Sequence, residues 1–174
     1  WNAFAVTGED PKLYGNLFDS ISVCLSKGLG CPVGSVLLGS KDFIAKALRV
    51  RKVFGGGMRQ AGFLAAAGIY ALDHHRERLK EDHKKAKEIE AILSKKDFIS
   101  SVSPVDTNII IFELKESVLD AQAFMDKMNE NNIRLISMGS GKLRLVTHLN
   151  YTNEMHSRLL SILNGFKVLM PIFL

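Results

Sequence analysis

The chain has 174 residues, of which 47% are hydrophobic and 24% are charged. This length is typical of roughly one domain, and the composition is that of a folded globular protein, which excludes a disordered chain. The 23 basic and 18 acidic residues leave a net charge of +5. That excess suits phosphate or carboxylate ligands but is low for a dedicated nucleic-acid binder, so we expect no nucleic-acid partner.

The cysteine content and the hydropathy limit the cellular compartments in which the protein is expected. Cys24 and Cys31 are too few for a disulfide framework and lack the two-residue gap of metal or redox pairs, so free thiols in the cytosol or an organelle matrix are predicted. No apolar run approaches the ~18–20 residues of a membrane span, and we expect no membrane partner and no metal. The chain opens at Trp1-Asn2 without a signal peptide, and we expect it to be a fragment.

The first half predicts an α/β arrangement around two glycine-rich stretches. A strand is predicted at 20–26 from period-two alternation, covered on both sides, and a second at 33–38. Ser40 is a candidate N-cap of the next helix. Three glycines at 55–57 predict a loop before an alanine-rich segment at 61–72. The charged run 74–93 then predicts one long, largely exposed helix.

Beyond Pro104 the pattern changes to a βαββα order. Strands are predicted at 108–113, around 134–136 and at 143–147, and helices at 117–131, with Ser117 and Asp120 as a capping-box-like start, and at 152–168. We therefore predict two parts: the end of a large domain with its interdomain helix over residues 1–103, and a small α+β domain over residues 104–174.

The sharpest chemical feature is Ser26-Lys27-Gly28-Leu29-Gly30. A lysine at the end of a buried strand, followed by glycines that allow close approach, can become a nucleophile if desolvation lowers its pKa. A strand-end lysine that simply reaches water remains open on position alone. Phosphate loops do not fit, because Gly34 to Lys41 ends Ser-Lys instead of Lys-Ser, and Gly28, Gly30 and Gly34 miss the dinucleotide spacing.

Several motifs together resemble one family. These are Asp19-Ser-Ile-Ser-Val-Cys-Leu-Ser-Lys-Gly-Leu-Gly-Cys-Pro-Val-Gly-Ser, then Arg51-Lys52, then Gly55-Gly-Gly-Met-Arg-Gln-Ala-Gly, and finally Arg144-Leu-Val-Thr-His148. In this order they resemble the low-specificity L-threonine aldolases, which depend on pyridoxal phosphate. The resemblance covers essentially all of this chain but only about the second half of a family member.

The resemblance implies a fold of aspartate-aminotransferase type and a role for four residues. Lys27 would bind pyridoxal 5'-phosphate covalently, and the cofactor would act as the electron sink for retro-aldol cleavage of threonine to glycine and acetaldehyde. Arg144, alternating with two leucines on a strand, would clamp the substrate carboxylate. Lys52 and Arg59 would face an active site, in their own or in a neighbouring subunit, Lys52 toward the substrate and Arg59 toward the cofactor.

The resemblance also implies what this chain does not carry. The ring-stacking histidine and the segments that bind the phosphate and the pyridine nitrogen lie upstream of Trp1 in relatives, so we expect the fragment alone to be inactive. His148 can approach the substrate, whereas the other histidines are expected to be surface or capping residues. The family implies a homodimer or homotetramer. A related transaminase or serine hydroxymethyltransferase, or a truncated non-catalytic subunit, remains an alternative.

Overall fold

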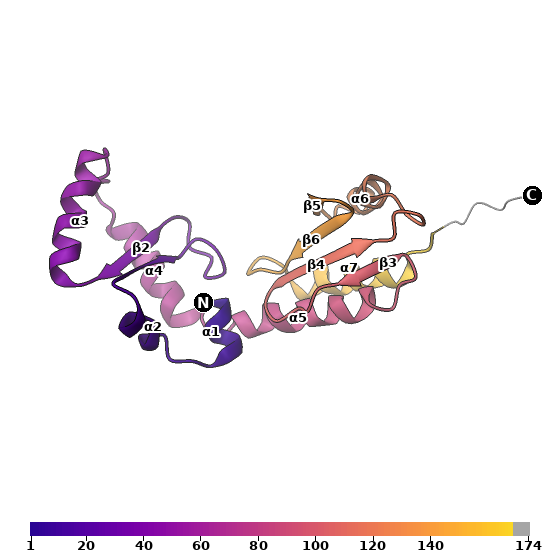
Figure 1. Ribbon diagram of the computed structural model, residues 1–174, viewed down its shortest axis with the longest axis horizontal. Coiled ribbons are helices and arrows are strands. Elements are labelled where there is room, and N and C mark those ends of the chain that lie inside the picture. The colour runs from indigo at the N-terminus through magenta and orange to yellow at the C-terminus, as the bar shows by residue number, and fades with distance from the viewer. Residues whose placement is uncertain (169–174) are drawn as a thin grey trace, which may run out of the picture. The chain divides into compact units, whose positions relative to one another are not determined.

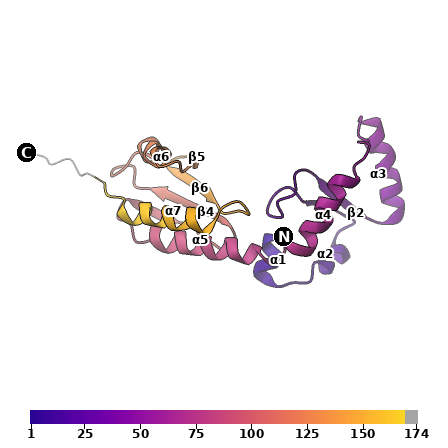
Figure 2. The same ribbon diagram turned by 180° about the vertical axis from the view of Figure 1, so that it is seen from behind.

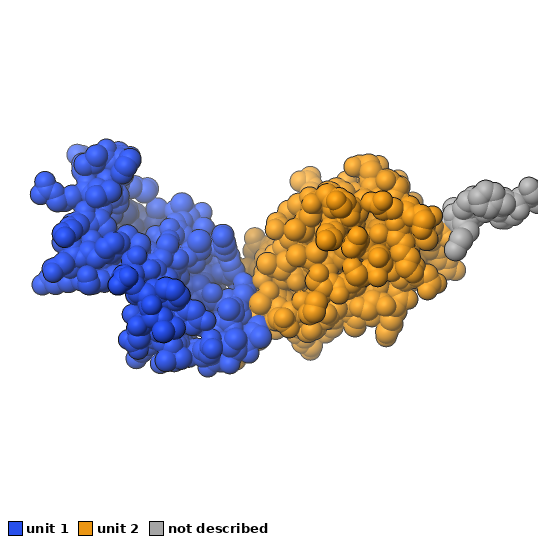
Figure 3. Space-filling view, in the orientation of Figure 1, with its two compact units in different colours: residues 1–79 blue, residues 80–174 orange. Residues whose placement is uncertain are grey.

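A computed structural model describes residues 1–168 and divides the chain into two compact units (Figure 3). Unit 1 comprises Trp1–Leu79 and unit 2 begins at Lys80. Both units mix helices and strands, in agreement with the predicted α/β class. The boundary predicted between residues 103 and 104 concerns the domains of the intact protein and stays a prediction.

Unit 1 is built around a two-stranded antiparallel sheet (Figure 1). Its two strands pair so that Val23 lies opposite Val36. Two helices of six residues at the start of the chain were not predicted from the sequence. In chain order the elements are α1 (Asn2–Thr7), α2 (Lys12–Leu17), β1 (Ser20–Cys24), β2 (Ser35–Gly39), α3 (Lys41–Val53) and α4 (Gly62–His74).

The core of unit 1 is small. Four apolar residues are buried in it, namely Leu29, Cys31, Ala71 and Leu79. The expectation that the first strand is covered on both faces is wrong within the described chain, because β1 alternates between exposed and half-buried residues and β2 is exposed throughout. The described part of the chain supplies these two strands with no further strand partner, so the outer edge of each strand is unpaired and the sheet is at most half-buried.

The helices of unit 1 begin and end for local reasons. Ser40 caps α3 by accepting a hydrogen bond from the Phe43 backbone N–H at 3.3 Å, as predicted. The prediction of one helix over 74–93 is wrong, because α4 ends at His74 and the next helix begins at Leu79. The His75 ring nitrogen Nδ1 lies 2.6 Å from the Leu29 carbonyl oxygen. This contact to a distant loop fixes the turn that separates the two helices.

Unit 2 is a four-stranded antiparallel sheet in the order β3-β4-β6-β5, with helices along one face (Figures 1 and 2). Helices α5 and α7 lie side by side in both views. The elements are α5 (Leu79–Leu93), β3 (Ile99–Val102), β4 (Ile109–Leu114), α6 (Ala121–Glu130), β5 (Ile136–Gly139), β6 (Lys142–Val146) and α7 (Asn153–Gly165).

Alternation along the strands separates a buried face of this sheet from an open one. On β4 the residues Ile110, Phe112 and Leu114 are buried, and on β6 Leu143 and Leu145 are buried. They pack against apolar residues of the three helices in one continuous core. The opposite face exposes a set of apolar side chains, which are Ile109, Ile136, Met138 and Val146. Only one face of the sheet is therefore used for folding of unit 2.

Candidate functional site

Lys27 lies at the start of a tight turn that follows β1. The Lys27 carbonyl oxygen accepts a hydrogen bond from the Gly30 N–H at 2.8 Å, and Gly30 has a φ of +72°. Gly28 is crowded, because a Cβ there would come within 3.1 Å of Asn2 Nδ2 and 3.2 Å of Leu79 Cδ2. The two glycines are thus required by the turn itself, and together they fix the backbone that carries the lysine.

A cavity of about 420 Å³ opens beside Lys27. Its walls come from α1, α2, β1 and β2 and are mostly apolar, and the lining includes Phe4, Tyr14 and Leu38. The Lys27 side chain is exposed and has no hydrogen-bond or ion-pair partner among residues 1–168. An amine in this position is free to form a covalent bond with a carbonyl compound of small-molecule size.

The same cavity tests whether pyridoxal phosphate fits the residues present. The amine of Lys27, which lines the cavity, can react with the aldehyde of that cofactor, and the apolar walls can pack against its aromatic ring. The lining holds no acidic side chain for a pyridine nitrogen and no arginine for a phosphate. Within this lining, Lys27 is the group that could bind the cofactor covalently, and the charged groups that would orient the cofactor would have to come from outside the lining.

Lys52 and Arg59 flank the glycine loop at residues 55–57, away from that lining. Lys52 lies in the last turn of α3, and a Cβ at Gly57 would lie 3.3 Å from its Nζ, so the side chain folds over the loop. Arg59 is exposed in the turn before α4, because that helix begins only at Gly62. Neither residue lines the Lys27 cavity within this chain, although both are predicted site residues.

Arg144 lies at the centre of the open face of the unit 2 sheet. It is on β6, an interior strand, with Ile111 of β4 and Ile136 of β5 as its direct cross-strand neighbours. Leu143 and Leu145 point into the core, so Arg144 occupies the other face, as the alternation predicts. Arg144 is therefore not a surface arginine on an edge strand.

The guanidinium of Arg144 retains unused hydrogen-bonding capacity. Its Nε is buried and has no hydrogen-bond partner in the described chain, which is unusual because buried donors are nearly always satisfied. The side chain as a whole is half-buried among isoleucines. A planar cation with a buried free N–H on an apolar surface is well suited to bind a carboxylate through two hydrogen bonds.

His148 follows the end of β6 and is exposed. Its Nδ1 accepts a hydrogen bond from the Asn150 backbone N–H at 3.2 Å. It lines a second cavity, of about 430 Å³, together with Arg134, Tyr151 and Arg158. This cavity belongs to unit 2 alone, and the role of His148 toward a substrate stays a prediction.

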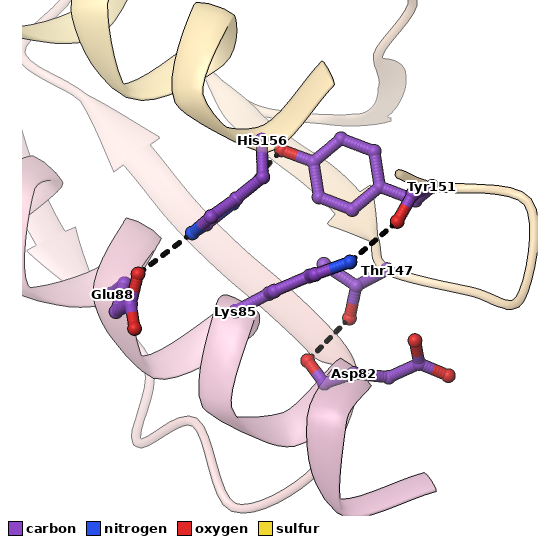
Figure 4. Close-up of polar contacts among 6 residues, drawn as sticks. All are labelled: Asp82, Lys85, Glu88, Thr147, Tyr151 and His156. Carbon is purple, nitrogen blue, oxygen red and sulfur yellow. Dashed lines mark hydrogen bonds and ion pairs between the residues drawn. The ribbon is translucent and has the colours of Figure 1, made fainter. Parts of the chain in front are cut away.

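A polar network in unit 2 was missed by the sequence analysis (Figure 4). The histidine of α7, His156, is buried, and its Nε2 lies 2.8 Å from Glu88 Oε2 while its Nδ1 lies 3.1 Å from the Tyr151 hydroxyl. Burial raises the pKa of Tyr151. The tyrosine therefore stays protonated and donates to Nδ1, which leaves the histidine N–H on Nε2, directed at the carboxylate.

Two further hydrogen bonds connect α5, the helix that carries Glu88, to the segment between β6 and α7. Lys85 Nζ donates to the Tyr151 carbonyl oxygen at 2.6 Å, and Thr147 Oγ1 donates to the Asp82 carbonyl oxygen at 2.8 Å (Figure 4). Asp82 is fully buried, so the expectation that the charges of this helix are mostly solvated is wrong for one face. The only trace in the sequence is the spacing of three between Asp82, Lys85 and Glu88, which places them on one side of a helix.

The state of the two cysteines and the hydropathy of the helices were also predicted from the sequence. Cys24 is exposed and Cys31 is buried, and both are free, as predicted. Within residues 1–168, none of the helices combines the length and the hydropathy that crossing a bilayer requires.

Comparison with solved structures defines the class of fold. A Listeria monocytogenes protein assigned provisionally as an L-allo-threonine aldolase aligns with 94% of this chain and 49% of its own, with a TM-score of 0.73 and 16% identity. Histidinol-phosphate aminotransferase from Clostridium acetobutylicum aligns with 94% of this chain and 51% of its own, with a TM-score of 0.63 and 14% identity. The chain therefore has the fold of part of an aspartate-aminotransferase-like protein, as predicted.

Sequence comparison defines the family. The model of the beta-eliminating lyases matches residues 1–117, and the chain belongs to that family. It is 46% identical over 138 residues to low-specificity L-threonine aldolase 1 of Arabidopsis thaliana, a match covering 78% of this chain and 38% of that protein. It is 42% identical over 154 residues to the low specificity L-threonine aldolase of Escherichia coli K12, covering 88% and 44%. The chain thus spans less than half the length of these relatives.

Proposed function

We propose that this chain is part of a longer lyase that depends on pyridoxal 5'-phosphate and cleaves L-threonine or L-allo-threonine to glycine and acetaldehyde. The observation that carries the proposal is an unpaired lysine amine beside a small apolar cavity, in a chain that is 42–46% identical to named threonine aldolases. The other aminotransferase-like activities have weaker support, because histidinol-phosphate aminotransferase resembles this chain at 14% identity.

Lys27 would hold the cofactor through its Nζ. When bound there, pyridoxal phosphate supplies the electron sink that makes cleavage of the substrate Cα–Cβ bond possible. The rigid turn from Lys27 to Gly30 supports this assignment, because it directs the amine from a fixed backbone. The small cavity walls would exclude water from one side of the ring.

Arg144 would bind the substrate carboxylate. The free, buried Nε and the apolar face around it support a two-point hydrogen bond whose strength is increased by low exposure to water. Such a clamp would fix the rotation of the amino acid, so that the bond to be broken is held in the reactive orientation. Lys52 would contribute positive charge near the substrate and Arg59 near the cofactor, each in its own or in a neighbouring subunit.

The intact protein would be a homodimer or homotetramer in a reducing compartment, in the cytosol or an organelle matrix. Large apolar side chains around the glycine loop are almost fully exposed, with Val53 at 83%, Phe54 at 85% and Phe63 at 84%. Such a patch is typical of a surface covered by another chain or segment. Sedimentation of the full-length protein would count the subunits. The free Cys24 and Cys31 support the compartment.

Borohydride reduction of the full-length protein loaded with pyridoxal phosphate tests the lysine assignment. We expect one modified peptide, containing Lys27, and no label in Lys27→Ala, whereas Lys41→Ala on the exposed side of α3 should label normally. A modified peptide that lacks Lys27 would overturn the assignment.

Product analysis tests the reaction itself. Threonine should yield glycine and acetaldehyde in equal amounts. Alanine with a keto acid should yield no new amino acid, which separates a lyase from a transaminase of the same fold. Amino-group transfer without acetaldehyde release would overturn the proposed reaction.

A further inference from the structure

The face of the sheet on which Arg144 lies depends on the register of a short strand, β6. β6 has only five residues, and side chains on a strand alternate between its faces. If β6 slipped by one residue against β4, Arg144 would exchange places with a core leucine. The chain after β6 forms no regular structure until α7 begins at Asn153. Five consecutive pairs with β4 and the buried Leu143 and Leu145 set this register, and contacts at the end of the strand can hold it further.

Thr147, the residue after β6, makes such contacts with two residues, Asn108 and Asp82. Its backbone N–H donates to the Asn108 carbonyl oxygen at 3.0 Å, and its carbonyl oxygen accepts from Asn108 Nδ2 at 2.8 Å. Its hydroxyl donates to the Asp82 carbonyl oxygen of α5 at 2.8 Å. Thr147 is 2% exposed and Asn108 7%. Because these groups are buried, a slipped strand would leave several of them unsatisfied, which is costly.

The segment that follows is held by the same face of α5. Lys85 bonds to the Tyr151 carbonyl oxygen, and Glu88 holds His156 against the Tyr151 hydroxyl. Asp82, Lys85 and Glu88 thus contact Thr147, Tyr151 and His156, three successive points from the end of β6 to the first turn of α7 (Figure 4). None of these three contacts involves the open face of the sheet, where Arg144 lies.

We propose that Thr147 is a positioning residue for Arg144: its hydroxyl, bonded to α5, anchors the end of β6 and so, together with the pairing to β4, holds the guanidinium on the face where the substrate carboxylate would bind. Lys85 supports the same register from the following segment. Thr147 contacts no substrate in this arrangement and acts through the strand. The inference rests on the proposed function of Arg144, although the register itself can be examined without it.

Two pairs of variants in the full-length protein test this role. Thr147→Val keeps the shape and removes the hydroxyl, whereas Thr147→Ser restores it. Lys85→Met removes the bond to Tyr151, and Lys96→Met removes a similar bond, from Lys96 Nζ to the Asn164 carbonyl oxygen at 2.8 Å. The Lys96 bond joins the distal ends of the same two helical segments, so it is a matched control for loss of stability.

We expect Thr147→Val and Lys85→Met to raise the KM for threonine by about 10-fold while kcat falls less than about 3-fold, since substrate binding is what a displaced arginine weakens. Thr147→Ser and Lys96→Met should keep the wild-type KM, even where Lys96→Met lowers the melting temperature. A crystal structure of Thr147→Val should show Arg144 displaced.

Unchanged KM in both Thr147→Val and Lys85→Met, or an equal rise of KM in Lys96→Met, would overturn the positioning role. If Thr147→Val does not fold, the comparison of the KM of Lys85→Met with the KM of Lys96→Met decides the question. Absence of threonine cleavage by the wild-type protein would contradict the proposed function instead, and the position of Arg144 in the variant crystals would still decide the inference about the register.

Discussion

The surroundings of Arg144 restrict the kind of ligand that its guanidinium can bind. It combines a buried, unpartnered Nε with an interior strand position and isoleucine neighbours. A lysine in its place would keep the charge but would lose the planar pair of donors. The shape of the guanidinium, in addition to its charge, is therefore expected to matter for binding an amino acid.

We predict that Arg144→Lys in the full-length enzyme lowers kcat/KM for threonine by about 10-fold to 1000-fold, because an ammonium cannot form the two-point clamp. Steady-state kinetics with threonine measure the effect, and Arg134→Lys, on the segment before β5, is the control. Unchanged kinetics would place Arg144 outside the site. Loss of folding in place of activity would instead indicate a structural role.

The sequence predicts on which face of a sheet a side chain lies where the alternation of its neighbours constrains it. The alternation Leu143-Arg144-Leu145 is sufficient to place the arginine opposite the core, and the structure agrees. His156 could not be predicted in the same way. Its partners, Glu88 and Tyr151, are 68 and 5 residues away in the chain, and no local periodicity reports a contact between two helices so far apart in sequence.

At the scale of elements, α5 is tied to the loop before β4 as well as to the segment after β6. The Glu90 carboxylate accepts a hydrogen bond from the Val105 backbone N–H at 3.0 Å and pairs with Lys87 Nζ at 2.9 Å. Burial acts to raise the pKa of Glu90, but the bonds from Lys87 and Val105 outweigh it, and the pKa is lowered overall. The ionised carboxylate is thus the form that stabilises this contact.

We predict that Glu90→Gln lowers the free energy of unfolding at pH 7 by less than about 1 kcal/mol. A carboxyl whose pKa is lowered on folding contributes stability that is present above the unfolded pKa and is lost as the pH falls through the folded pKa. The difference between wild type and variant should therefore shrink as the pH falls below the ordinary glutamate pKa of about 4.3 and vanish below the lowered folded pKa. Urea unfolding at pH 7 and at pH 3.5 measures it.

The exposed pair of Lys127 and Glu130 serves as the control for that experiment. Its two atoms lie 2.9 Å apart, but both side chains are more than half exposed. Glu130→Gln should change stability little at either pH, because exposed ion pairs contribute little. An equal loss in Glu90→Gln at pH 7 and at pH 3.5 would contradict the role of the charge.

Element boundaries show where sequence patterns are sufficient and where they are not. The helix predicted to begin at Ser117 begins instead at Ala121, and its N-cap is Asp120, whose carboxylate accepts a hydrogen bond from the Ala123 N–H at 3.0 Å. Strand β3 was not predicted, since Ile99–Val102 has two serines at its centre and only pairing with β4 makes it a strand. Tertiary pairing overrides weak local propensity in such segments.

At the scale of the whole molecule, the two units differ in how completely they bury their apolar residues. Unit 1 leaves β2 exposed throughout and β1 at most half-buried, and it exposes the apolar residues around its glycine loop. Open strand edges and apolar faces of this kind favour association with other chains. The cavity beside Lys27 also lacks an arginine and an acidic residue among its lining side chains.

We predict that the 174-residue chain alone, given saturating pyridoxal phosphate and L-allo-threonine, releases no acetaldehyde above the level of Lys27→Ala, because no group anchors the phosphate or pairs with the pyridine nitrogen beside that lysine. A coupled assay for acetaldehyde measures this. Saturable release that is abolished in Lys27→Ala would contradict the prediction and show that the described residues are sufficient.

Unit 2 has the opposite character, with one continuous core shared by α5, α6, α7 and the buried face of its sheet. Its polar ties, from Asp82 to Thr147 and from Glu88 to His156, also close within that same stretch of chain. We therefore expect the region from residue 80 onward to fold when it is expressed apart from the rest of the chain. A gene divided near codon 80 would encode two polypeptides, of which the second carries Arg144 on a self-contained scaffold, suited to splitting the enzyme and reassembling it from separately expressed halves.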